Sequence, residues 1–283
     1  MARSSPDARA YPAPPDEPVD LSSDRLFIGS IGKCFRVLEA LNAHGQPMTL
    51  TALAAASRLD RSATQRITHT LGRLGYLRQH PDTRAWSLGT RLLEFGHTVL
   101  ANDRLRECAL PLLETLNQRT GETVNLMELE GREIVYVARF PSRHAVSVDL
   151  HVGSRLPAYC TAAGRAILAR MRESDATALL CSAERVRMTE RTVTDLPALL
   201  TLLARARADG FSVNDQEAFI GDLSVAAAIV DHVGHPVGAI NIAVPTPRWQ
   251  RRALERELVP QVVATAREIS FAFASSSRSS RSR

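Results

Sequence analysis

Apolar residues recur at helical spacing from Ser30 onward, and glycine and proline within residues 44–47 end this pattern. Thr49 is a residue type that caps helices, so it predicts the start of a second, short helix. After a polar turn the helical spacing returns over residues 62–74, and Gly75 ends it. The pattern therefore predicts three consecutive helices joined by short turns.

The third predicted helix has an apolar side and a polar side. Ser62, with Gln65 three residues later, predicts a capping box that opens this helix. With Ile67 at the centre of the buried side, a rotation of about 100° per residue assigns the other positions. The residues expected inside are Ala63, Thr70, Leu71 and Leu74. The residues expected to face outward or to flank that side are Gln65, Arg66, Thr68, His69 and Arg73.

A β-hairpin is predicted directly after the third helix. Residues 76–78 and 84–88 have strand character, and they flank a polar turn at residues 80–83. Three helices followed by a hairpin form a winged helix-turn-helix. Its outward amides, arginines and hydroxyls suit the major groove of DNA, where arginine pairs with guanine and glutamine with adenine. A three-helix module that binds proteins stays open as an alternative.

The positive charge of the chain is concentrated on this segment. Residues 58–91 contain seven arginines and two aspartates, and seven minus two equals the net charge of +5 of the whole chain. Such a patch is typical of a protein that binds a polyanion, and a solvated helix face is the alternative. The residues predicted to contact DNA are Arg61, Ser62, Thr64, Gln65, Arg66, Thr68, His69, Arg73 and Arg84.

Farther along the chain, two more helices precede a change to the alternating pattern of β-strands. Residues 89–102 and 105–119 read as helices, with Pro111 as a point of kinking or breaking. Their apolar stripes belong to a core or pair with another copy, and we expect dimerisation, since DNA readers of this kind span two half-sites. The predicted strands are residues 123–130, 133–140, 145–150, 210–213, 223–231 and 236–244. Helices at 163–171, 196–209 and 251–273 on a face of this sheet predict an antiparallel α+β domain.

Several classes of protein are excluded by what the sequence lacks. No apolar run is long enough to span a membrane, and the N-terminal residues lack the apolar segment of a secretory signal. The cysteines lie far apart, and the histidines show no ligand spacing, so neither a zinc site nor a disulfide framework is predicted. No glycine-rich phosphate loop follows a strand. We therefore expect a cytoplasmic protein without metal, cofactor or membrane partner.

Three stretches resemble the IclR family of bacterial transcriptional regulators. The first combines SIGKCFRVLEAL with RSATQRITHTLGRLGYL, the second is VGSRLPAYCTAAGRAILA, and the third is GFSVNDQEAFIGDLSVAAAIVD ahead of AINIAVP. The LPAYCT core of the second is similar to the family branch that governs aromatic-acid catabolism through protocatechuate and β-ketoadipate. The third stretch departs from the family pattern, since Asn214 stands where an acid is usual and Val230 where an aromatic residue is usual.

The resemblance implies an α+β fold in which a winged helix-turn-helix DNA-binding domain is joined by a linker helix to a GAF-like, antiparallel-sheet effector-binding domain. Proline- and serine-rich ends complete the predicted organisation. The expected segments are a disordered arm (1–24), the DNA-binding domain (25–88), the linker helix (89–102), the effector-binding domain (103–274) and a disordered basic tail (275–283).

The partners implied by the resemblance are a double-stranded DNA operator, a small organic acid as effector, and further copies of the chain in a dimer or tetramer. The family's pocket would place backbone N–H groups before the helix at residue 163 against a carboxylate, in agreement with the attraction of helix N-termini for anions. The residues carried over to this pocket are Ala145, Val148, Leu156, Cys160, Thr161, Ala162, Ala163, Asn214, Asp215, Ser224, Asn241 and Ala243.

Two other functions remain open from the residues themselves. A hydrolase or acyltransferase with an accessory DNA-binding-like module would use Cys160 as a nucleophile or Asp215 with Glu217 as an acid pair. No base lies near Cys160 in the sequence, so a buried, inert thiol is the favoured interpretation, and a polar contact or turn is favoured for the two acids. An adaptor that binds proteins would bind no DNA.

Overall fold

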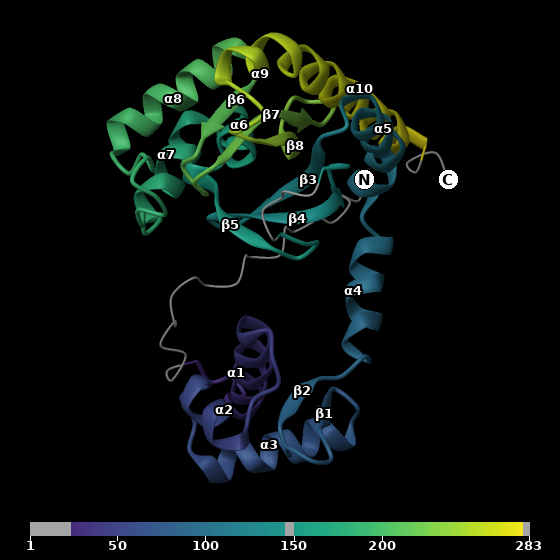
Figure 1. Cartoon of the computed structure of the whole chain (residues 1–283), viewed down its shortest axis with the longest axis vertical. Helices are drawn as coiled ribbons and strands as arrows, with labels where there is room; N and C mark the ends of the chain where they lie inside the picture. The colour runs from purple at the N-terminus through teal and green to yellow at the C-terminus, as the bar shows by residue number, and fades with distance from the viewer. Residues whose placement is uncertain (1–23, 145–149, 280–283) are drawn as a thin grey trace, which may run out of the picture. The chain divides into compact units, whose positions relative to one another are not determined.

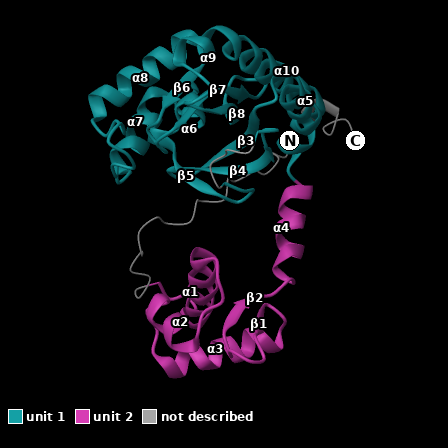
Figure 2. Ribbon diagram, viewed as in Figure 1, with its two compact units in different colours: residues 1–16, 103–283 teal, residues 17–102 magenta. Residues whose placement is uncertain are grey.

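The computed structural model describes residues 24–144 and 150–279 of the 283-residue chain. These residues divide after Asn102 into two compact units, which Figure 2 shows in different colours. We call residues 24–102 the helical unit and residues 103–279 the sheet unit. The division falls at the end of the predicted linker helix, and the other predicted boundaries stay predictions.

The helical unit consists of three helices, a two-stranded wing and a fourth helix (Figure 1). The elements are α1 (Gly29–His44), α2 (Leu50–Ala56), α3 (Arg61–Arg73), β1 (Leu77–Gln79), β2 (Trp86–Leu88) and α4 (Leu92–Ala101). The wing strands are antiparallel, with Leu77 opposite Leu88. Apolar side chains from the first three helices and the wing share one core, formed by Val37, Leu41, Met48, Leu53, Leu71 and Leu77. The predicted winged helix-turn-helix is confirmed.

The start of α3 differs from the predicted capping box. Asp60 is the N-cap, and its carboxylate accepts a hydrogen bond of 2.7 Å from the backbone N–H of Ala63. A negative charge at this position also interacts favourably with the helix dipole, which a serine two residues later does not offer. Ser62 therefore lies exposed within the first turn of α3 and does not cap it.

The sheet unit contains a six-stranded antiparallel sheet with helices on both faces (Figure 1). The strand order is β5-β4-β3-β8-β7-β6. The strands are β3 (Thr123–Glu130), β4 (Glu133–Phe140), β5 (Arg155–Pro157), β6 (Ser212–Asp215), β7 (Asp222–Val230) and β8 (Pro236–Pro245). The helices are α5 (Arg104–Thr120), α6 (Ala162–Arg170), α7 (Glu173–Ser182), α8 (Leu196–Asp209), α9 (Arg251–Glu257) and α10 (Val259–Ser279), and a 3₁₀ turn (Ala158–Cys160) precedes α6.

Alternation along the strands gives the sheet two apolar faces. Val124 and Leu126 of β3 point to the face covered by α5, α9 and α10, whereas Met127 joins the core on the α6–α8 face. Because both faces are covered, both sets of alternating residues are buried along β3, β7 and β8. The predicted α+β fold is confirmed, but the helices cover two faces of the sheet instead of one.

Proline has different effects in two helices of the sheet unit. α5 continues through Pro111, because Leu105, Ala109, Leu113 and Leu116 on either side of it are buried against the sheet. Their burial outweighs a cost of about 3 kcal/mol for an interior proline. The predicted single helix over residues 251–273 is instead divided at Leu258, and Pro260 lies in the first turn of α10, where a missing N–H costs nothing.

Three further elements differ from the predicted pattern. α7 was not predicted, since its weakly amphipathic sequence gives little periodic signal. α10 runs to Ser279, so residues 275–279 are helical and do not belong to a disordered tail. The strand predicted at residues 145–150 lies outside the described residues except for Leu150. None of the described helices combines the length and the apolar character that crossing a bilayer requires.

Candidate DNA-binding surface and effector pocket

A groove on the helical unit brings together residues from α2, α3 and the wing. Most of the predicted DNA contacts lie around it, although the wing and α3 are separated in sequence. Trp86 of β2 and Thr49 at the start of α2 complete its walls. The predicted contact residues with exposed side chains at this groove are Arg61, Ser62, Gln65, Arg66, His69 and Arg84.

Three of the predicted contacts are not exposed in this groove: Thr64 and Arg73 lie outside its lining, and Thr68 lines it with an almost fully buried side chain. Thr64 and Thr68 are 0% and 1% exposed, so their side chains belong to the core side of α3. Their hydroxyls donate hydrogen bonds to backbone oxygens of Asp60 and Gln65, which satisfies them without water. Thr70, which was predicted to be inside, is exposed, and Leu74 is 49% exposed. Arg73 is exposed at the end of α3, outside the lining of the groove.

The wing holds Arg84 in a defined position. The turn closes through hydrogen bonds from the backbone N–H of His80 to the Ala85 oxygen (2.8 Å) and from the N–H of Arg84 to the His80 oxygen (3.0 Å). Arg84 has a φ of 56°, which is uncommon for a residue with a Cβ. The Gln79 side chain donates to the Arg84 oxygen and supports this conformation. The arginine at the tip of the wing is therefore presented by a braced turn.

The arginines of the helical unit differ from those of the sheet unit in their partners. No ion pair forms within the described part of the helical unit, and Arg78 and Arg91 instead donate to Thr90 and to the Leu74 oxygen. The sheet unit pairs Arg155 with Glu130 and Glu133, Arg165 with Glu217, Arg172 with Asp175, Arg191 with Asp215, Arg207 with Glu173, Arg248 with Glu122, Arg251 with Glu255 and Arg256 with Glu257. The groove of the helical unit thus carries cations that no acid of that unit neutralises, as a phosphate-binding surface requires.

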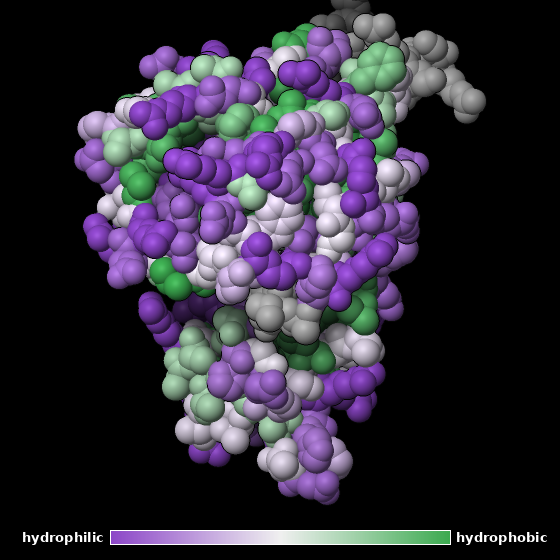
Figure 3. All heavy atoms as spheres, turned by 45° about the horizontal axis from the view of Figure 1, so that its top comes forward, coloured by the Kyte–Doolittle hydropathy of each residue, from purple (hydrophilic) through white to green (hydrophobic). Residues whose placement is uncertain are grey.

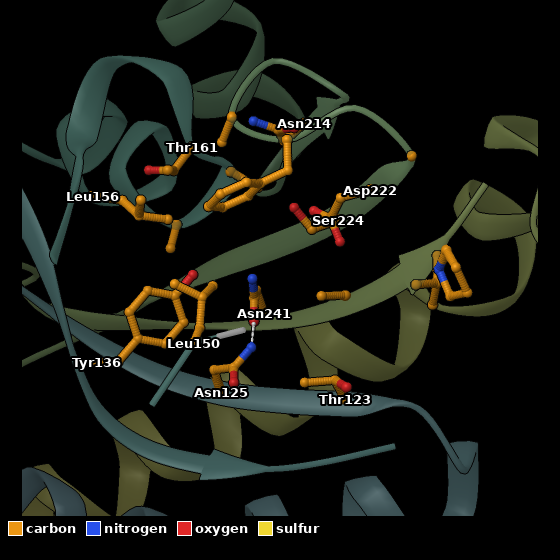
Figure 4. Close-up of a pocket in the computed structure, with 18 of the residues that line it drawn as sticks. Thr123, Asn125, Tyr136, Leu150, Leu156, Thr161, Asn214, Asp222, Ser224 and Asn241 are labelled. Carbon is orange, nitrogen blue, oxygen red and sulfur yellow. Dashed lines mark hydrogen bonds between the residues drawn. The ribbon is translucent and has the colours of Figure 1, made fainter. Parts of the chain in front are cut away.

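A pocket of about 320 Å³ lies in the sheet unit, between the sheet and the start of α6 (Figure 4). Its volume is in the range of small-molecule sites, and its walls combine apolar side chains with a few polar groups. Eight residues implied by the family resemblance line it: Leu156, Thr161, Ala162, Ala163, Asn214, Ser224, Asn241 and Ala243. Ala145 and Val148 lie outside the described residues.

The start of α6 forms one wall of the pocket. Thr161 caps the helix by accepting a hydrogen bond of 3.2 Å from the N–H of Gly164. A Cβ on Gly164 would lie 2.2 Å from the Ala158 oxygen, so glycine is required for the preceding 3₁₀ turn to pack on α6. The first N–H groups of a helix have no acceptor within it, and Ala162 and Ala163 are both in the lining of the pocket. This wall therefore favours an anion.

Amide side chains form the floor of the pocket. Asn125 of β3 and Asn241 of β8 are cross-strand partners, and Asn125 Nδ2 donates to Asn241 Oδ1 at 2.7 Å. Arg139 of β4 donates to Asn125 Oδ1 at 3.1 Å, so a chain of polar groups runs from a guanidinium to Asn241. Figure 4 shows the Asn241 nitrogen pointing into the cavity. The guanidinium polarises this donor toward an acceptor in the pocket.

Three ionisable residues of the pocket were not predicted: Tyr136, Arg139 and Asp222. Burial raises the pKa of Asp222 to about 7, and the Arg139 guanidinium opposes that shift. Burial, together with the nearby Asp222 carboxylate, raises the pKa of the Tyr136 phenol above its ordinary value. Asp222 is the first residue of β7 and belongs to the same face as Ser224, a spacing of two that indicates a shared face in a strand. The spacing of two between Asp222 and Ser224 was the only sequence signal for this position, and it was too common among strands to single out Asp222.

Cys160 and Asp215 are not in the lining of the pocket, contrary to the expectation for both. Cys160 is fully buried behind the start of α6, where burial raises the pKa of its thiol to about 11. Asp215 is paired at 3.3 Å with Arg191. Glu217 is engaged by the buried Arg165, with Nη1–Oε1 and Nη2–Oε2 distances of 2.6 Å and 2.5 Å.

These partners oppose the catalytic interpretation of the same residues. A thiol with a raised pKa is a poor nucleophile at neutral pH, and each of the two acids is engaged by an arginine instead of facing the other as an acid pair. Within residues 24–144 and 150–279, no group of three or more histidine, cysteine, aspartate or glutamate side chains could hold a metal ion.

Comparisons with known proteins agree in the family they indicate. Residues 30–81 match the IclR helix-turn-helix domain, and residues 97–271 match the family described as Bacterial transcriptional regulator IclR C-terminal. The chain is 33% identical to the Pca regulon regulatory protein of Pseudomonas putida over 249 residues, which cover 88% of this chain and 85% of that protein.

Two solved structures share the fold over nearly the same range. A transcriptional regulator from Rhodococcus sp. RHA1 superimposes with a TM-score of 0.78 at 35% identity and covers 88% of this chain and 99% of its own. An IclR homolog from Microbacterium hydrocarbonoxydans, crystallised in complex with 4-hydroxybenzoate, has a TM-score of 0.73 at 27% identity, with coverage of 87% and 99%.

Proposed function

Because this chain belongs to the IclR family of bacterial transcriptional regulators, we propose that it controls an aromatic-acid catabolic operon by binding a small carboxylate effector. The observation that carries the proposal is the pocket, whose anion-favouring wall at α6 lies next to apolar side chains such as Leu156. The Pca regulon relative and the 4-hydroxybenzoate complex of a homologue support this effector class. The family and these relatives are regulators, so the hydrolase or acyltransferase hypothesis is set aside.

In this proposal the protein acts in the cytoplasm on a double-stranded operator. α3 lies in the major groove, where Gln65 and Arg66 read base edges, while Arg61 and Ser62 contact phosphates. Arg84, presented by the braced wing, reaches the adjacent minor groove. The absence of an acidic partner for the arginines of the described groove supports this assignment.

We propose that the protein functions as a homodimer or as a tetramer built from dimers. α4 contains no buried residue, and Leu93 and Val99 are 71% and 70% exposed. Ile31, predicted to lie in the core of α1, is instead 50% exposed, and Phe35 one turn later is 57% exposed. Figure 3 shows hydrophilic residues over most of one face of the molecule, with apolar patches between them. Apolar surface of this kind is typical of protein contacts.

The effector proposal is tested by blocking the pocket. Ala163→Trp fills the wall at α6, so we expect operator binding to persist while the response to the effector is lost. Thermal shift against protocatechuate, 4-hydroxybenzoate and β-ketoadipate identifies the ligand, since a ligand at about 100 times its Kd stabilises the native state by about 2.7 kcal/mol. A variant that still responds at wild-type ligand concentrations would place the effector elsewhere.

The dimer proposal has its own measurement. Val99→Asp puts a charge on the exposed apolar side of α4, and His97→Asp is the matched control on an exposed polar position of the same helix. We expect light scattering to show that only Val99→Asp shifts the wild-type oligomer toward the monomer. A monomeric wild-type protein, or equal behaviour of the two variants, contradicts the proposal.

A further inference from the structure

The Asp222 carboxylate is directed at the pocket and accepts no hydrogen bond from the described residues. The backbone N–H and C=O of Asp222 are bonded to the Phe219 oxygen and the Gln216 N–H. Figure 4 shows the Asp222 and Ser224 oxygens across the cavity from Leu156 and Thr161. A carboxylate that lines a pocket, half-buried and without a donor among the described residues, is arranged for a group that those residues do not supply.

The other ionisable side chains in the pocket do not satisfy Asp222. They are Arg139 and Tyr136, both on β4. Arg139 acts on the Asp222 carboxylate through its field and donates to Asn125. Tyr136 is neutral near pH 7, as any phenol with an ordinary or raised pKa is. The lining residues from β3, β6, β8, α6 and the β6–β7 loop carry no ionisable side chain. Among the described lining residues, a protonation change between pH 6 and pH 8 therefore belongs to Asp222.

The pocket thus has two chemically different ends. The α6 wall offers N–H donors from Ala162 and Ala163, while the opposite side offers the acceptor of Asp222. A ligand with only a carboxylate satisfies the first end and leaves Asp222 facing an apolar edge. A ligand that also carries a donor on its far side satisfies both.

Resting on the proposed function, we propose that Asp222 is the specificity-determining residue for the second polar group of the effector, which is a hydrogen-bond donor such as a hydroxyl opposite the carboxylate. The ionised Asp222 accepts this hydrogen bond, and the charge assistance strengthens it. A site built around such a bond rejects an analogue that lacks the donor, because the ligand then covers the acceptor and leaves it unpaired.

The two ligand types therefore respond to pH with opposite signs. A hydroxy acid binds the ionised form of Asp222, so its affinity rises as pH passes upward through about 7. An acid without the hydroxyl binds the protonated form, so its affinity falls over the same range. With that pKa, the ionised fraction rises about tenfold between pH 6 and pH 8, and the neutral fraction falls by the same factor.

The test measures the Kd of benzoate, 3-hydroxybenzoate and 4-hydroxybenzoate by calorimetry at pH 6, 7 and 8 with the full-length protein. We expect at least one hydroxybenzoate to bind up to about tenfold more tightly at pH 8 than at pH 6, while benzoate weakens by up to about tenfold. The same sign for all three overturns the inference and leaves the proposed function standing. No binding by any of them overturns the proposed aromatic-acid effector and this inference with it.

Two variants separate the role of Asp222 from general effects of pH. Asp222→Asn keeps the size of the side chain and removes its titration, so the pH dependence of every ligand should fall below twofold. Asp222→Leu removes the acceptor, so the affinity for benzoate relative to the hydroxybenzoates should rise by at least tenfold. Thermal unfolding checks that both variants are folded, and an unchanged pH profile in Asp222→Asn overturns the assignment.

Discussion

The helical unit and the sheet unit carry similar arginines in opposite circumstances. In the sheet unit eight arginines form ion pairs with glutamates and aspartates, from the exposed pair of Arg256 and Glu257 to the buried pair of Arg165 and Glu217. In the described helical unit Arg61, Arg66 and Arg84 surround a groove and meet no acid. A charge with a partner in its own fold contributes to that fold, whereas a charge without one is available to a polyanion. The difference favours the groove arginines, which gather without an acid, as the ones available for a ligand, without reference to any relative.

Within the described sheet unit, Asp222 is a charged residue without an ion-pair partner. It is a half-buried acid of the pocket, and the neighbouring Arg139 acts on it without a hydrogen bond between their side chains. A charge left unpaired in a pocket therefore marks a functional position, as the unpaired arginines do on the surface.

The largest effect on stability is expected from breaking the buried ion pair of Arg165 and Glu217. Glu217→Ala leaves Arg165, which is 1% exposed, as an unpaired buried charge and also removes the hydrogen bond from the Val193 N–H. We expect a loss of about 3–5 kcal/mol in the free energy of unfolding of the sheet unit. Urea denaturation measures it.

The matched control for that change is Arg256→Ala, which breaks an exposed pair at the end of α9. Exposed pairs contribute at most about 1 kcal/mol, so this variant should be close to wild type. Equal losses in the two variants would mean that burial does not govern the value of these ion pairs.

The next largest effect is a gain in stability when Asp222, the acid without an ion-pair partner among the described residues, is replaced. Because the folded-state pKa of Asp222 is raised from 3.8 to about 7, its favourable contribution exists below pH 3.8 and is lost as pH rises through 7. Asp222→Asn should therefore be more stable than wild type at pH 8, by about 2–4 kcal/mol, and the difference should shrink toward pH 4.

Urea denaturation of both proteins across this pH range gives the comparison. Glu128, whose pKa is raised to about 7 by burial and by Asp103, titrates in both proteins and cancels. A constant difference between the two proteins at every pH would show that Asp222 ionises normally in the fold.

A smaller effect, on DNA affinity, is expected from replacing an arginine of the groove on the helical unit. Arg66→Ala should weaken binding to a duplex selected from a random-sequence library by about 1–3 kcal/mol, with little change in stability. Arg205, an exposed arginine of α8 in the sheet unit, provides the control variant Arg205→Ala. Fluorescence anisotropy measures both, and the same affinity for Arg66→Ala and wild type would remove Arg66 from the interface.

The smallest effect tests the revised faces of α3. Thr68→Val retains the shape of a side chain that is 1% exposed and removes a hydroxyl bonded to the Gln65 oxygen. Operator affinity should stay within about twofold of wild type, and stability should fall by about 0.5–1.5 kcal/mol at most. A large loss of affinity in the same titration would return Thr68 to the DNA-binding surface.

The parts of the fold that depend on local patterns could be predicted from the sequence. α8 was predicted with the bounds that the structure has, and the wing followed from a polar turn between two short strands. The face of α3 was predicted less well, because Thr64 and Thr68 satisfy their hydroxyls within the helix and can be buried like apolar residues.

The pocket could be predicted only as far as the family resemblance reached. Thr161 and Ala163 follow from the motif before α6, but Asn125, Arg139 and Asp222 come from three strands whose register no local pattern specifies. Their meeting depends on β3 pairing with both β4 and β8, which are about a hundred residues apart in sequence. Residues of this kind become visible as a site only once the sheet is assembled.

The adjacency of the first and last helices of the sheet unit has a consequence for how such regulators are built. α5 and α10 pack together in one apolar cluster, and Arg104 near the start of α5 lies within hydrogen-bonding distance of Ser276 near the end of α10. A domain whose first and last helices lie close together can be transferred to another protein as one unit. In chimeras that place this unit behind a different DNA-binding domain, the junction should therefore lie just ahead of Asp103, where the two compact units divide.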